Sequence, residues 1–138
     1  MQQGIDKVIL ETLRLDARTP LLAIARKLNV SEGTVRNRVK KMVASGVIAR
    51  FTVELGGESG GVEALVGVRT QAKVPTERVV KRLRSLAGVG RVYEVAGQYD
   101  VIVFARADNL EALNDVLERV RQTPEVLETE SFTVLKRN

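Results

Sequence analysis

The first part of the chain carries its apolar residues at helical spacing. Between residues 31 and 46 they recur at i, i+4, i+7 and i+8, which predicts a helix with one buried stripe made of Val35, Val39, Met42 and Val43. Ser31 suits the N-cap of this helix because its hydroxyl can accept a hydrogen bond from an unpaired backbone amide. Gly46 suits the left-handed position at which a helix ends.

Two more helices are predicted before this one. The nearer helix begins at Thr19 and Pro20, a capping residue followed by the proline that is tolerated at the first helical position. The other helix covers residues 6–15. Asn29 accepts left-handed geometry, so we expect a sharp turn before the third helix. The apolar positions of the two helices are Leu21, Ile24, Ala25 and Leu28, and Ile5, Val8, Ile9 and Leu13. The three helices predict a small helix-turn-helix bundle.

The polar positions of the third helix indicate what it binds. At about 100° per residue, six of them point away from the apolar stripe or project from its flanks, namely Thr34, Arg36, Asn37, Arg38, Lys40 and Lys41. A solvated surface is the ordinary interpretation of a cationic helix. Helix-turn-helix spacing favours a different one, because it presents the N-terminal half of this helix outward, as DNA reading requires.

The distribution of charge also favours DNA. The 138 residues include 22 Lys and Arg against 17 Asp and Glu, which gives a net charge of +5. Residues 1–56 hold 10 of the basic and 5 of the acidic residues, and the remainder holds 12 of each. Because the whole net charge lies in the helical part, we expect that part alone to meet a polyanion, double-stranded DNA.

The middle of the chain predicts a connection between two domains. Residues 47–55 predict an extended strand, and the glycine-rich run that follows predicts a flexible hinge. A phosphate-binding loop is the alternative interpretation of the glycines, but no Gly-Lys-Ser/Thr follows them. We therefore divide the chain into a helix-turn-helix domain at 1–47, a linking strand and hinge at 48–61, and a second domain at 62–138.

The second domain alternates strand and helix patterns in the order βαββαβ. Strands are predicted at 62–72, 89–96, 100–105 and 126–135, and helices from Pro75 to before Gly88 and at 109–122. The last helix is expected to bury Leu110, Leu113, Val116, Leu117 and Val120. This order predicts an α+β, ferredoxin-like fold with both helices on one face of the sheet.

The other face of the sheet needs a cover. Domains of under ~80 residues bury too little apolar surface to be more than marginally stable alone. We therefore expect two copies to pair their sheets through alternating apolar residues that include Val101, Val103 and Phe132 or their strand neighbours.

Composition excludes several classes of site. The chain has no Cys and no His, so it lacks a thiolate nucleophile, an imidazole base and the usual zinc ligands. We expect no metal, no cofactor and no enzymatic activity. No apolar run approaches the ~20 residues of a membrane span, and no signal-peptide pattern opens the sequence. We expect no membrane partner and a cytoplasmic protein.

Several motifs give the chain a resemblance to a known family. They are LNVS at 28–31, VRNRVKKM at 35–42, GVI at 46–48, GQYD at 97–100 between two strands, and Val126 with Thr129, Ser131 and Thr133 in the last strand. In this order they resemble the Lrp/AsnC, or feast/famine, transcription regulators over nearly the full length. The resemblance implies a helix-turn-helix domain, a linking strand and a βαββαβ domain that dimerises by pairing its sheets. Dimers of that family often assemble into tetramers or octamers, and amino acids commonly bind between dimers.

The resemblance also implies a candidate effector site, which consists of Gly97, Gln98, Tyr99, Asp100, Thr129, Ser131 and Thr133. A free amino acid needs a carboxylate for its ammonium group, which Asp100 would supply, and donors for its own carboxylate, which loop amides and hydroxyls would supply. The residues taken alone favour a plainer interpretation, in which Asp100 caps the hairpin and the hydroxyls are ordinary strand surface. Ala96 and Ser131 replace threonines that are usual in the family.

Three functions follow from these patterns. The leading one is a sequence-specific DNA-binding transcription regulator that responds to an amino acid or related metabolite bound at a subunit interface. Its DNA-binding residues would be Ser31, Thr34, Arg36, Asn37, Arg38, Lys40 and Lys41. The alternative is an architectural DNA-binding protein with little sequence preference and no effector. The third is an enzyme like the sirohaem decarboxylases among similar proteins, which the lack of His disfavours.

Overall fold

The computed structural model describes residues 2–56 and 60–137. The chain forms two compact units, Met1–Glu54 and Leu55–Asn138. The predicted hinge is only partly covered, because residues 57–59 lie outside the described residues. Each unit is described by itself below.

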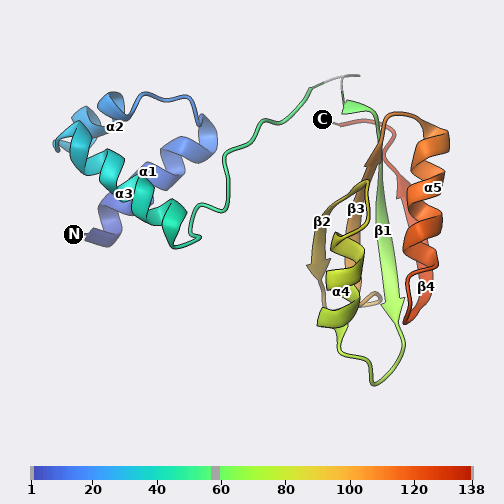
Figure 1. The fold of residues 1–138 in the computed structure, drawn as a ribbon. Coiled ribbons are helices and arrows are strands. Elements are labelled where there is room, and N and C mark those ends of the chain that lie inside the picture. Colours follow the sequence, from blue (N-terminus) through green and yellow to red (C-terminus); the bar gives the residue numbers. More distant parts are fainter. Residues whose placement is uncertain (1, 57–59, 138) are drawn as a thin grey trace. The chain divides into compact units, whose positions relative to one another are not determined.

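The N-terminal unit consists of the three predicted helices, α1 (Gln2–Leu15), α2 (Leu21–Leu28) and α3 (Glu32–Ala44) (Figure 1). Helix α1 begins four residues earlier than its predicted start. The core forms where the three helices meet, and its buried side chains are Ile9, Leu13, Ile24, Ala25, Val35 and Met42. The apolar spacing therefore predicts this packing well.

Two details of the bundle differ from the prediction. Val43 is 46% exposed rather than buried, because at 100° per residue it lies about 80° around the helix from Val35, at the margin of the stripe. Pro20, and not Thr19, occupies the N-cap of α2, and the Thr19 hydroxyl donates to the Asp16 carbonyl at 2.9 Å. Asn29 adopts the expected left-handed conformation, with φ of 54°.

The linking strand is not formed. Residues 49–56 belong to no helix or strand, and Figure 1 draws them as coil. A strand needs a neighbour that takes up its backbone hydrogen bonds, and the described part of a single chain offers none here. The alternating pattern alone thus does not produce a strand in this chain.

The C-terminal unit has the predicted βαββαβ order. Its elements are β1 (Val62–Thr70), α4 (Thr76–Arg84), β2 (Val89–Glu94), β3 (Val101–Ala107), α5 (Leu110–Arg121) and β4 (Val126–Thr133). The sheet runs β2-β3-β1-β4 with antiparallel neighbours throughout. Both helices lie against one face, and this face encloses the core (Figure 1). Leu110 is 57% exposed, contrary to prediction, because it is the first residue of α5.

The two faces of the sheet differ from the predicted assignment. Val101 and Val103, expected on the uncovered face, are fully buried against the helices. The prediction named these two valines or their strand neighbours, since β3 is apolar at both alternating sets of positions and period two does not say which set is the core. The valines were the wrong set. The uncovered face instead carries their neighbours and Phe132. We call it the open face, and its apolar members are Leu65, Tyr93, Ile102, Phe104 and Phe132.

Candidate functional site

Helix α3 is held in place by its cap and its apolar stripe. The Ser31 hydroxyl accepts a hydrogen bond from the Thr34 amide at 3.1 Å, and the Ser31 and Thr34 hydroxyls lie 2.8 Å apart. The predicted N-cap is therefore confirmed. On the inner side, Val35 is completely buried and Met42 nearly so. These contacts fix which side of the helix faces outward.

The outward side of α3 is polar and cationic. Arg36, Asn37, Lys40 and Lys41 are all exposed, and we call these four residues the cationic face. Arg36 contacts Glu32 one turn earlier along the helix. Within the described residues, Lys40 and Lys41 have no ion-pair partner. The face thus offers three guanidinium or ammonium groups and one amide to a ligand.

Arg38 has a different environment from the cationic face. Its Nη1 donates to the Asp6 carboxylate of α1 at 2.8 Å, and its side chain is only 21% exposed. Such a partly buried, charge-assisted bond is stronger than an exposed pair. Arg38 therefore joins α3 to α1, a contact that the sequence pattern did not indicate because the two residues are 32 positions apart.

Asp100 holds the β2–β3 loop to the end of β1. Its carboxylate accepts hydrogen bonds from the Thr70 amide at 2.8 Å and from the Thr70 hydroxyl at 3.2 Å. Its own amide donates to the Val68 carbonyl at 2.9 Å. Asp100 thus has a structural role, but its carboxylate bonds to β1 and not within the hairpin that the plainer interpretation names. The half-buried carboxylate keeps further lone pairs for another donor.

The rest of the loop lies on the open face. The Gln98 carbonyl accepts a hydrogen bond from Arg69 Nε at 3.2 Å. The Tyr99 ring covers Gly67, where an added Cβ would lie 2.8 Å from the ring. Gly67 pairs with Ile102, so the ring packs on the side of the sheet away from the helices. Gly97 has a φ of 151°, which favours glycine at the start of the loop.

The hydroxyl row of β4 points to the opposite face. Thr129, Ser131 and Thr133 pair with Val68, Val66 and Ala64, whose side chains all face the helices. Directly paired residues point to the same side of a sheet. Within one chain, the structure therefore separates the two halves of the predicted effector site, although Thr129 and Asp100 both lie at the Val68 end of β1.

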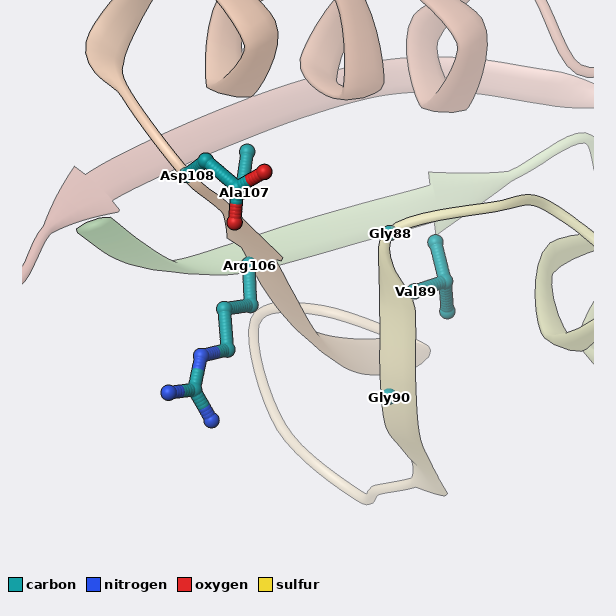
Figure 2. Close-up of a pocket in the computed structure, with 6 residues that line it drawn as sticks. All are labelled: Gly88, Val89, Gly90, Arg106, Ala107 and Asp108. Atoms are coloured by element: carbon teal, nitrogen blue, oxygen red, sulfur yellow. The ribbon is translucent and has the colours of Figure 1, made fainter. Parts of the chain in front are cut away.

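One pocket lies at the other end of β3. Its volume is about 330 Å³, and Figure 2 shows its lining residues, which are Gly88, Val89, Gly90, Arg106, Ala107 and Asp108. The Arg106 side chain points away from the Asp108 carboxylate (Figure 2). The two charges thus do not converge as an amino-acid site would require. A second hollow, of about 420 Å³, lies in the N-terminal unit. It is lined by residues of α1, of the turn that follows α1, and by Lys27 of α2.

Neither hollow includes a predicted site residue. The sequence pattern gave no signal for them, because backbone and short side chains form most of the first. Among the described residues, no helix combines the length and apolar character that crossing a bilayer requires.

Two family models match the chain, one in each compact unit. The AsnC-type helix-turn-helix domain matches residues 4–43, and the Lrp/AsnC ligand binding domain matches residues 63–138. The first match includes α3 and its cationic face, and the second includes the sheet, the β2–β3 loop and β4.

Curated relatives match over most of their length. The HTH-type transcriptional regulator LysM of Sulfurisphaera tokodaii is 39% identical over 131 residues, which is 95% of this chain and 93% of the relative. The HTH-type transcriptional regulator FL11 of Pyrococcus horikoshii is 33% identical over 133 residues, with 96% and 88% covered.

Solved structures share the fold. The feast or famine regulatory protein of M. tuberculosis, complexed with L-methionine, has a TM-score of 0.83 and 26% identity, and the match covers 99% of this chain and 94% of that one. The E. coli AsnC structure has a TM-score of 0.75 and 26% identity, with 97% and 92% covered.

Proposed function

The chain belongs to the Lrp/AsnC family of transcription regulators, and from that premise we propose how its own residues bind DNA and an effector. It is a DNA-binding regulator with an effector-binding domain. The cationic face is the observation that supports assigning DNA binding to residues of α3. It points outward on a helix whose cap and buried inner stripe are both fixed.

The residues of α3 have different roles in this proposal. Arg36, Lys40 and Lys41 contact phosphates, because flexible cations suit the backbone of DNA. Asn37 reads a base, since its amide matches the edge of an adenine in the major groove. Ser31 and Thr34 lie at the N-terminal end of the helix, where recognition helices approach bases, and also hold that end together. Arg38 adds positive charge while it joins α3 to α1.

We further propose that two copies pair through the open face. Phe104 and Phe132 are 43% and 51% exposed there, and Tyr93 packs edge-on against Phe104. A two-fold pair of sheets buries these rings and supplies the two helix-turn-helix units that a palindromic site needs. Tetramers or octamers of such dimers bring the β2–β3 loop of one dimer to the surface of another.

The effector proposal follows from that assembly. Because the loop and the β4 hydroxyls lie on opposite faces of one sheet, a complete site needs residues from more than one chain. An amino acid is the proposed effector class, supported by the similarity to a regulatory protein in complex with L-methionine. Asp100 would then accept the ammonium group while it remains bonded to Thr70.

Each part of the chain has its own role in this proposal. We propose residues 1–47 for DNA binding, 48–61 as the connection and 62–138 for effector binding and assembly. The names of the relatives favour a regulator over an enzyme. They also favour a regulator over an architectural protein without an effector.

A salt titration of DNA binding tests the cationic face. Lys40→Ala and Lys41→Ala should each lower affinity for all sequences and reduce the log–log salt slope by ~0.9, because each loses one phosphate contact. Lys81→Ala on α4 is the matched control, since the Lys81 side chain is 76% exposed in the other unit. Slopes equal to wild type in both α3 variants would refute the assignment of this face.

A further inference from the structure

A charged network joins three segments of the C-terminal unit. Its centre is the Glu63 carboxylate on β1. Arg137 Nε, from the tail after β4, donates to Glu63 Oε2 at 2.9 Å, and Arg137 Nη2 contacts Oε1. Arg106 Nε on β3 lies 3.9 Å from Oε1. Two guanidinium groups therefore share one carboxylate.

Each of these arginines also holds the connection between the domains. Arg137 Nη1 donates to the Leu55 carbonyl at 2.9 Å, and Arg106 Nε donates to the Gly60 carbonyl. The tail reaches this place because the Val134 amide bonds to the Glu63 carbonyl at 2.9 Å. We call Glu63, Arg106 and Arg137 the linker clamp.

The clamp holds the connection at Leu55, and this shortens the stretch of chain that lies between the last residue packed on the N-terminal core and the first one held by the C-terminal unit. Ile48 still packs on the N-terminal core, and Leu55 is held by Arg137. Residues 49–54 lie between these two points. The bonds are charge-assisted, and the Glu63 side chain is only 23% exposed, so solvent screens them less than it screens an exposed pair.

We propose that the linker clamp limits the range of distances that the helix-turn-helix unit can take from the C-terminal unit. We call this range its reach, and infer that it selects the spacing between the two DNA half-sites. Glu63 and Arg137 are positioning residues that act without touching DNA. The DNA part of this inference rests on the proposed function, whereas the reach itself does not.

Opening the clamp has a calculable effect on reach. Arg137→Gln releases Leu55 and leaves Gly60 held, so the nearest held point of the C-terminal unit moves from Leu55 to Gly60, and the number of chain positions between it and Ile48 rises from six to eleven. The root-mean-square extension of a flexible chain grows as the square root of its length, which widens the spread by roughly a third. Effective concentration falls as about the −3/2 power of length, or roughly 2.5-fold.

Spin-label distances within one chain measure reach directly. The protein has no Cys, so Ala17→Cys and Ala87→Cys, both at exposed positions, place one nitroxide on each unit. Mixing with excess unlabelled protein restricts the signal to pairs inside one chain. Arg137→Gln and Glu63→Gln should both broaden the distance distribution. Arg121→Gln is the matched control, because it breaks a 3.0 Å pair with Glu118 on α5.

Equal widths in wild type, Arg137→Gln and Glu63→Gln would overturn the proposal, provided that all three unfold at the same temperature. Broadening in the Arg121→Gln control as well would also overturn it, since general loss of charge would then be the cause.

A DNA experiment separates this inference from the proposed function. Arg137→Gln should bind DNA with two correctly spaced half-sites roughly 2.5-fold more weakly than wild type, but a single half-site equally well. A chain that binds no DNA would refute the proposed function and leave the distance result standing. DNA binding with an unchanged spacing preference would refute the clamp alone.

Discussion

Phe132→Ala tests the pairing of open faces. Phe132 lies on β4 and is 51% exposed in the single chain. A Phe side chain can bury roughly 200 Å², so about 100 Å² of this ring remains for a partner to cover. At ~25 cal/mol per Å², its burial contributes about 2.5 kcal/mol per copy. A two-fold interface contains the residue twice, which makes about 5 kcal/mol per dimer.

The expected loss is large enough to measure by sedimentation equilibrium. About 5 kcal/mol corresponds to a dimer dissociation constant raised on the order of 10³- to 10⁴-fold. Leu110→Ala is the matched control, because Leu110 is 57% exposed but lies at the start of α5 in the helix layer. The control should sediment as wild type does.

A Phe132→Ala variant as dimeric as wild type across micromolar concentrations would refute the pairing of open faces. Dissociation of the Leu110→Ala control to the same extent as Phe132→Ala would refute it as well. In either case the open face would not be the surface that joins two copies.

Three further substitutions test separate parts of the account. Ser31→Ala should lower the free energy of unfolding by about 1 kcal/mol in chemical denaturation, because it removes the cap of α3, and an unchanged midpoint would argue against the cap. Asn37→Ala should relax discrimination at one base pair by about 1 to 3 kcal/mol in binding to single-base variants of an operator, whereas a uniform loss would make Asn37 a phosphate contact. Asp100→Asn keeps an acceptor for Thr70 but loses the charge, so it should abolish the effect of amino acids on DNA affinity and leave effector-free binding intact; a retained response would exclude Asp100 from the site.

Local chemistry explains what the sequence predicts well. The cap at Ser31, the left-handed turn at Asn29 and the stripe through Val35 and Met42 depend on residues within a few positions of each other. Periodicity and turn residues are sufficient to find such features. The order of helices and strands follows in the same way.

Long-range contacts explain what the sequence does not predict. Glu63 and Arg137 are 74 positions apart, and only the pairing of β4 with β1 brings them together. The side of β3 that faces the helices is likewise fixed by tertiary packing, because Val101 and Ile102 are both apolar. The linking segment has a strand pattern but no strand, since hydrogen-bonding partners are not encoded in the segment itself.

The candidate effector site shows the same limit. The family resemblance places Asp100 and Thr129 in one proposed site, yet strand register puts the β4 hydroxyls and Tyr99 on opposite faces. The resemblance to the family suggested the ligand class, whereas the residue types alone favoured an ordinary hairpin and strand surface. The arrangement depends on which other chain approaches that end of the sheet.

The central claim, a sequence-reading regulator that senses an amino acid, is tested most directly by one competition experiment. The purified full chain is mixed with fragmented genomic DNA, with and without each amino acid at millimolar concentration, and the affinity of recovered fragments is compared with that of bulk DNA. We predict recovered sites that bind at least ~10³-fold more tightly than bulk DNA, and at least one amino acid that changes this affinity by roughly 5- to 150-fold. Equal affinity for recovered and bulk DNA, unaltered by every amino acid, would contradict the account and leave an architectural DNA-binding protein in its place.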